Sequence, residues 1–138
     1  MSLAINTSKI ATLCPEEYRK YSEAYDKFTD FGWAAYTNMT IGEAFEYVCR
    51  RVDDGGESDD KLKADLADAV KGVIKALDSK GIHGVVPGVI DTETEVGLVF
   101  TLPEATVFAR VPTEEGKRIL KALNATEADF EDTECYLA

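Results

Sequence analysis

The sequence predicts an α+β protein with three N-terminal helices, a small and mostly antiparallel sheet of about three strands, and a C-terminal helix. Apolar residues recur at helical spacing up to about residue 80, then at strand-like spacing, and again at helical spacing over 114–123. Because helices and strands are segregated along the chain, we expect the helices to pack on one face of the sheet. The 138 residues suffice for a single domain, 1–138, of which 1–13 and 126–138 are expected to be flexible.

The first helix is predicted from Pro15 to about Tyr36. Its apolar residues are spaced by three and four and therefore lie on one face: Tyr18, Tyr21, Tyr25, Phe28, Phe31 and Ala35. Pro15 suits a first helical turn, and Gly32 is expected to end or bend the helix.

Two further helices are predicted by their caps. Thr40 and Glu43 form a capping-box pattern before an apolar stripe that runs to Val52. Ser58 is predicted to cap a third helix, with its stripe running from Leu62 to Leu77, and Gly81 to end it.

The segment 53–60 joins these two helices and carries five carboxylates around a glycine pair. Its spacing does not fit a calcium loop, because neither register from Asp53 or Asp54 places glycine sixth and glutamate twelfth. Arginines before the glycines and aspartates after them complement the ends of two helix dipoles. We interpret the segment as a connector and predict no metal.

Beyond Gly81 the pattern changes to strands. Residues 96–102 alternate, Pro103-Glu104 suggests a turn, and 105–111 is predicted to run back as a hairpin, with 85–90 as a third strand. Thr113 is expected to cap the last helix, 114–123, and Thr126 one more turn.

The formal net charge is −11, which argues against nucleic-acid binding because phosphates require Lys and Arg. Residues 1–80 hold 15 acids and 11 bases, net −4, whereas residues 81–138 hold 11 acids and 4 bases, net −7. Any charged partner is therefore expected to be basic and to contact the C-terminal half. With no membrane-spanning run, no signal-peptide block and three scattered cysteines, we expect a cytoplasmic protein without membrane contact.

Three groups of residues are candidates for function. Trp33 and Tyr36 belong to a cluster of aromatic residues that is either core or a binding site. His83, between glycines, is the only histidine and could act as an acid or base, although its spacing supplies no partner. The acidic tail residues are candidate contacts for a basic partner: Glu127, Asp129, Glu131 and Asp132.

These observations favour a non-enzymatic interaction or regulatory module that presents an acidic surface to a basic protein and needs no cofactor. The alternative is a small-molecule-binding protein or enzyme with a pocket between the aromatic helix and the sheet, using His83. Because a small sheet leaves free edges, we also predict a homodimer through a sheet edge.

Overall fold

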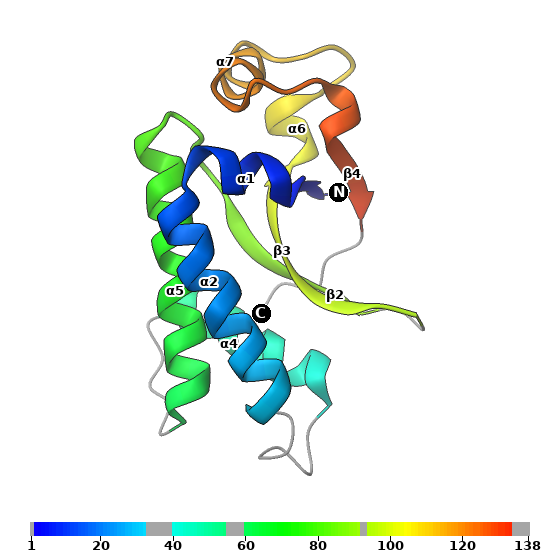
Figure 1. Cartoon of the computed structure of the whole chain (residues 1–138). Helices are drawn as coiled ribbons and strands as arrows, with labels where there is room; N and C mark the ends of the chain where they lie inside the picture. The colour runs from blue at the N-terminus through cyan, green and yellow to red at the C-terminus, as the bar shows by residue number, and fades with distance from the viewer. Residues whose placement is uncertain (1, 33–39, 55–59, 92–93, 134–138) are drawn as a thin grey trace.

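The fold is α+β, with helices gathered beside and above one antiparallel sheet (Figure 1). The structure is a computed structural model, and it describes residues 2–32, 40–54, 60–91 and 94–133. The helices are α1 Thr7–Leu13, α2 Pro15–Lys27, the π-helical turn η1 Phe28–Gly32, α4 Ile41–Asp54, α5 Lys61–Ser79, α6 Glu104–Val107, α7 Glu114–Leu123 and the 3-10 turn η2 Glu127–Asp129. The strands are β1 Ser2–Ile5, β2 Val86–Asp91, β3 Val96–Pro103 and β4 Phe130–Thr133.

The sheet has four strands in the order β2-β3-β1-β4, and every pair is antiparallel. The hairpin is β2–β3, which corrects the predicted pairing of 96–102 with 105–111. Residues 104–107 instead form the helical turn α6, followed by an isolated bridge between Phe108 and Pro112. Pro103 stands at the N-cap of α6, and the buried side chain of Val107 anchors the turn, so the chain leaves the sheet there.

Both ends of the described chain belong to the sheet, and the expectation that 1–13 and 126–138 are flexible stays a prediction. β1 is a central strand, with Leu3 opposite Leu102 on one side and opposite Asp132 on the other. Leu3, Ala4 and Ile5 are all buried, so β1 shows no alternation of polar and apolar residues that would have marked it as a strand. Residues 134–138 lie outside the described part.

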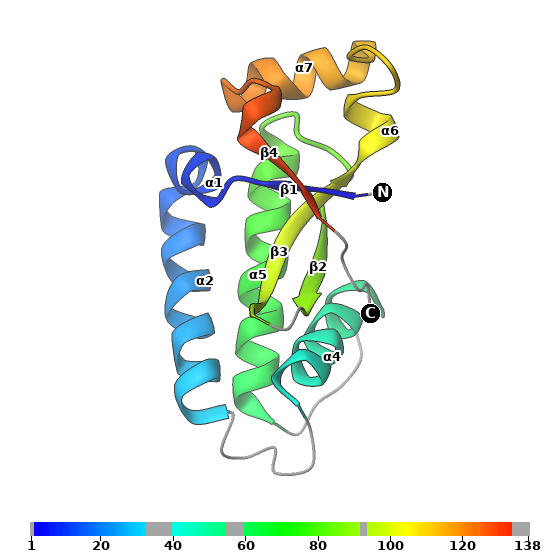
Figure 2. The same cartoon turned by 90° about the vertical axis from the view of Figure 1, so that its right-hand side faces the viewer.

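The aromatic face of α2 packs on the sheet. The ring of Tyr21 meets that of Phe100 on β3 edge-on, with centroids 5.1 Å apart, and Tyr25 stacks on Phe45 of α4 at 5.5 Å. α4 contacts β2 and β3, and α5 packs against α2 and α4 from behind (Figures 1 and 2). These contacts enclose the core. That every helix lies on one face of the sheet stays a prediction.

The helix boundaries follow local capping chemistry. The predicted capping box at Thr40 is confirmed, since the backbone N–H of Glu43 donates to Thr40 Oγ1 at 3.1 Å and the N–H of Thr40 donates to Glu43 Oε1 at 3.4 Å. The N-cap of α5 is Asp60 and not Ser58, because its Oδ1 accepts from the N–H of Leu62 at 2.9 Å.

The predicted stop of α5 at Gly81 is confirmed. Gly81 has φ of +89°, its N–H donates to the carbonyl of Asp78, and the N–H of Ile82 donates to the carbonyl of Leu77, each at 3.0 Å. This is the Schellman arrangement, in which a glycine takes the left-handed position after the helix. Leu77 and Ile82 are fully buried, which ties the end of α5 to the core.

Candidate functional site

The end of the sheet beside β4 gathers the acidic tail residues that the sequence singled out. Residues 127–132, here named the acidic edge, form η2 and most of β4 and contain four acids and no base. Thr126 is the N-cap of η2, as predicted, and its N–H donates to Asp129 Oδ2 at 2.7 Å. The backbone of these four acidic residues is thus part of regular secondary structure.

Lys9 of α1 fixes the acidic edge to the N-terminal part of the fold. Its Nζ donates to the carbonyl of Asn124 at 2.9 Å and lies 3.8 Å from Asp129 Oδ2, with both charged side chains about a quarter exposed. The N–H of Asn6 donates to the carbonyl of Asp129 at 3.2 Å. Asp129 therefore has a structural role as a cap and ion-pair partner, whereas Glu127 is exposed.

The register of β4 defines which backbone groups face outward. The bond from the Asn6 N–H to the Asp129 carbonyl fixes the alternation of the ladder, so the next two residues whose backbone groups face each other are Ala4 and Glu131. The intervening residues Phe130 and Asp132 direct their backbone groups away from β1. The N–H of Phe130 is taken by the carbonyl of Glu127, which leaves the carbonyl of Phe130 and both groups of Asp132 on the open side.

A groove of about 320 Å³ lies beside this strand and is named here the edge groove. Its lining combines an apolar part with three charged residues: Leu3, Phe108, Ala109 and Phe130, with Glu104, Arg110 and Glu127. Phe108 meets Phe130 edge-on, with ring centroids 5.9 Å apart at 89°. Val111, on the turn that follows, is 71% exposed and is the exposed large hydrophobic residue of the described chain.

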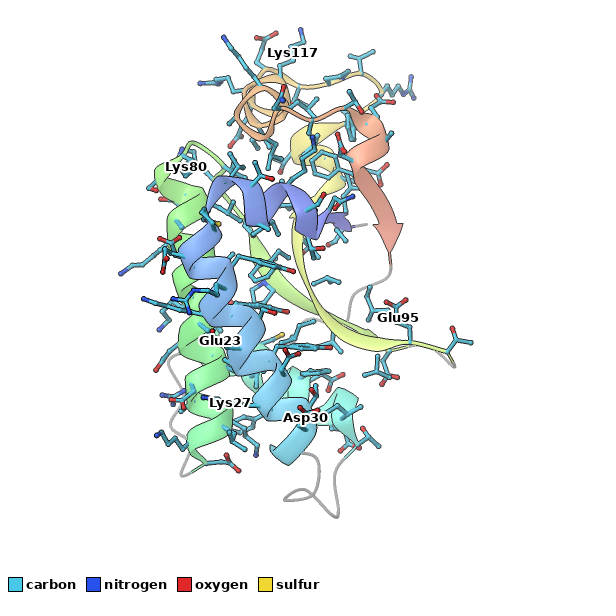
Figure 3. The ribbon with its side chains drawn as sticks, in the orientation of Figure 1. Glu23, Lys27, Asp30, Lys80, Glu95 and Lys117 are labelled. Atoms are coloured by element: carbon cyan, nitrogen blue, oxygen red, sulfur yellow. The ribbon has the colours of Figure 1, made fainter. Side chains whose placement is uncertain are left out.

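The charge around this end is unevenly distributed. α7 carries Glu114 and Glu115 in its first turn, balanced by Lys117, Arg118 and Lys121, and its net charge is small. Lys117 pairs with Glu114 at 3.2 Å and lies on the outer side of α7 (Figure 3). Of the net charge of −7 on residues 81–138, the acidic edge supplies −4, and the other −3 equals the charge of Asp91, Glu93 and Glu95.

The other candidate residues lie elsewhere. Trp33 and Tyr36 fall outside the described residues, and Glu131 and Asp132 are described by their backbone in β4. His83 does have a carboxylate partner, since its Nδ1 lies 2.7 Å from Asp78 Oδ1, but both side chains are about 60% exposed. His83 does not line the edge groove.

The space between the aromatic helix and the sheet is filled by side chains. Tyr21 and Phe28 are buried, and burial raises the pKa of the Tyr21 hydroxyl far above its ordinary value and that of Tyr25 to a lesser extent. A second groove, of about 350 Å³, lies instead between α2 and α5. It is lined by small or apolar residues and by charges of both signs: Ala24, Leu62 and Ala69, with Lys20, Glu23, Lys27, Asp65 and Asp68.

Cys14 and Cys49 are buried, and burial raises the pKa of the Cys14 thiol, which disfavours the reactive thiolate. Within residues 2–32, 40–54, 60–91 and 94–133, no three His, Cys, Asp or Glu side chains are grouped so as to hold a metal ion. The helices of the same ranges include none that is long and apolar enough to cross a bilayer.

Comparison with protein families, with curated proteins and with solved structures finds no match to this chain. The site is therefore defined by its own geometry. Sequence reasoning identified the acids of the edge but missed Glu104, Phe108 and Arg110, because 105–111 was read as a strand in the sheet.

Proposed function

We propose that this protein is an interaction module that presents the acidic edge to a basic protein partner. One observation carries the proposal: the backbone of residues 127–132, which include four acids, forms η2 and most of β4 along the open margin of the sheet. A basic partner would meet acidic residues whose backbone is already ordered, which loses less conformational entropy on binding than a flexible tail does.

The strength of this contact can be estimated from exposed ion pairs, which contribute about 0.2–1 kcal/mol each. Three neutralised acids would then remove about 1.5 kcal/mol, equivalent to roughly tenfold in the dissociation constant. Exposed charges are screened over about 8 Å at physiological ionic strength, so binding should weaken as salt is added.

The experiment measures the binding of a fluorescein-labelled decapeptide of alternating glycine and lysine by anisotropy. The test variant combines Glu127→Gln, Glu131→Gln and Asp132→Asn and leaves Asp129 unchanged because it caps η2. The matched control neutralises three exposed acids of α2, η1 and α5, Asp26, Asp30 and Asp68, of which Asp30 lies at the opposite end of the molecule from α7 (Figure 3).

The proposal predicts that the test variant binds about tenfold more weakly than the control variant, and that the difference shrinks between about 50 and 200 mM salt. Equal binding by the two triple variants would show that net charge alone attracts the peptide. Binding that is indifferent to salt, or no binding at all, would also contradict the proposal.

The alternative function, a small-molecule site that uses His83, has less support. Its expected location, between the aromatic helix and the sheet, is filled by the contact of Tyr21 with Phe100. His83 lies just after the C-terminal end of α5. A thermal-shift screen of metabolites, run with the wild-type chain and with His83→Ala, tests it: a metabolite that stabilises only the wild type would revive this function.

The predicted homodimer through a sheet edge has two candidate strands, β2 and β4. Two copies of the acidic edge would bring eight acids together, which opposes pairing through β4. We therefore assign the predicted dimer contact to β2, although Pro87 removes one backbone donor there. Sedimentation that shows only monomer at micromolar concentration would remove this prediction.

A further inference from the structure

We infer that the open side of β4 binds an extended, basic segment of the partner as an added antiparallel or parallel strand. This inference rests on the proposed function and specifies how the partner is held. It is carried by three features that meet at one margin of the fold: backbone groups that have no strand partner among the described residues, a neighbouring groove lined by apolar and charged residues, and a surplus of acidic residues.

The backbone supplies the first feature. On the side of β4 opposite β1, the described chain has no strand, and the carbonyl of Phe130 and the N–H and carbonyl of Asp132 point outward. Figure 1 shows β4 at the right-hand margin of the sheet, with α6 and α7 above it, α2 and α5 on the left, and α4 below. An extended peptide can pair with these three groups, as in other cases where a strand is added to a sheet edge.

The edge groove supplies the second feature, because alternate side chains of an added strand point to one face of the sheet. The Phe130 side chain belongs both to β4 and to the groove, so side chains on that face of the added strand reach the groove. Phe108 and Ala109, which are not buried, offer apolar contact there beside the charged residues of the groove. The groove volume of about 320 Å³ lies at the lower end of the range for ligand pockets and suits one or two aliphatic side chains.

Charge selects the occupant. Natural edge strands are often guarded by charged side chains, most often Lys, by Pro or by bulges. The four residues of β4 contain two acids, no base and no proline, so the charge on this edge opposes an acidic segment but not a basic one. An acidic segment or a second copy of β4 would place like charges on neighbouring strands, which is unfavourable. A segment that alternates basic and aliphatic residues satisfies the backbone, the groove and the charge together.

The test uses the whole chain and a labelled octapeptide of alternating lysine and valine. A second peptide of the same sequence carries an N-methyl group on every backbone amide, so it keeps the side chains and charges but cannot donate to a strand. Binding by the second peptide is expected to be at least about tenfold weaker, because main-chain hydrogen bonds supply the affinity of strand addition.

Two variants make the matched pair on the protein side. Asp132→Pro removes the outward N–H and one charge, whereas Asp132→Asn removes the charge and keeps the N–H. We expect Asp132→Asn to bind the lysine–valine peptide about two- to threefold more weakly than the wild type, and Asp132→Pro about tenfold more weakly or worse. Hydrogen exchange at the Glu131 amide reports whether β4 stays paired with β1 in each variant. If β4 does not stay paired, the comparison of the methylated and unmethylated octapeptides decides whether strand addition occurs.

The results separate this inference from the function on which it rests. If both octapeptides bind equally and both Asp132 variants weaken binding equally, the acidic surface stands and strand addition is wrong. If the glycine–lysine decapeptide also fails to bind, the proposed function fails as well. If the Asp132 amide of the free protein is protected increasingly with protein concentration, a second copy occupies the edge and the inference is overturned.

Discussion

Gly116 lies in the first turn of α7, where the helix approaches α6 so closely that a side chain has no room. A Cβ added there would overlap the carbonyl oxygen of Val107 and would lie 2.7 Å from the Val107 Cα and 2.9 Å from Thr113 Oγ1. Two of these three atoms are backbone and cannot rotate away. We therefore expect Gly116→Ala to force α6 and α7 apart and to shift the turn that carries Phe108 and Arg110.

The expected cost follows from two opposing terms. Overpacking of this kind costs about 1–3 kcal/mol, and disturbance of the Thr113 cap adds about 1 kcal/mol. Alanine is the better helix former by at most about 1 kcal/mol, which offsets only part of this. The net destabilisation is about 2–3 kcal/mol, or roughly 6–12 °C in melting temperature for a chain of this length.

Urea denaturation followed by circular dichroism measures the free energy of unfolding of both forms. Gly72→Ala is the matched control, because nothing lies within 4 Å of a Cβ at that position in α5, and it should raise stability by up to about 1 kcal/mol. A Gly116→Ala protein as stable as the Gly72→Ala protein would refute the described packing of α6 on α7.

Two further predictions concern single side chains. Thr113 Oγ1 donates to the carbonyl of Thr106 and accepts from the N–H of Gly116 at 2.9 Å, so Thr113→Ala should lower the free energy of unfolding by about 1–2 kcal/mol, whereas Thr113→Ser should retain most of it. Burial, and then the charge of Asp54, raises the pKa of the Asp53 carboxyl. The folded state therefore binds this proton more tightly than the unfolded state does. As a result, the protein loses stability as the pH rises above the ordinary pKa of about 3.9. Asp53→Asn should accordingly melt higher than the wild type at pH 7 and equally at about pH 3, and an offset that is the same at both pH values would contradict the assignment.

Local signals predicted most of the helices. The capping box at Thr40, the cap at Thr113 and the glycine stop at Gly81 each depend on residues within one turn, and each is present in the structure. The stripe of α5 is buried where helical spacing placed it. The same reasoning placed the α5 cap two residues early, because Ser58 and Asp60 are both good N-caps and only the fold selects between them.

The sheet was predicted less well because its pairing is long-range. β1 is four residues long, buried on both faces, and pairs with residues at positions near 102 and 131. No local pattern indicates such a strand, since each of its partners is supplied by a distant part of the chain. β4 pairs with β1 alone in the described sheet, so a sequence pattern that does not indicate β1 does not indicate β4 either.

The candidate site, like the fold, was predicted only in part. Composition identified the acids of the tail, but their position beside the edge groove follows from the β1–β4 pairing and from the turn after α6. His83 acquired a partner, Asp78, through the Schellman turn that folds the chain back after α5, a contact that sequence spacing alone did not suggest.

Hydrogen exchange at two neighbouring amides of β4 tests most directly that the acidic tail is an edge strand with an open side. The N–H of Glu131 faces β1 and should exchange slowly, whereas the N–H of Asp132 faces outward and should exchange at least about tenfold faster in the free monomer. Rapid exchange at both amides would mean that the tail does not pair with β1. Slow exchange at both would mean that the edge is already covered, and either result would contradict the account.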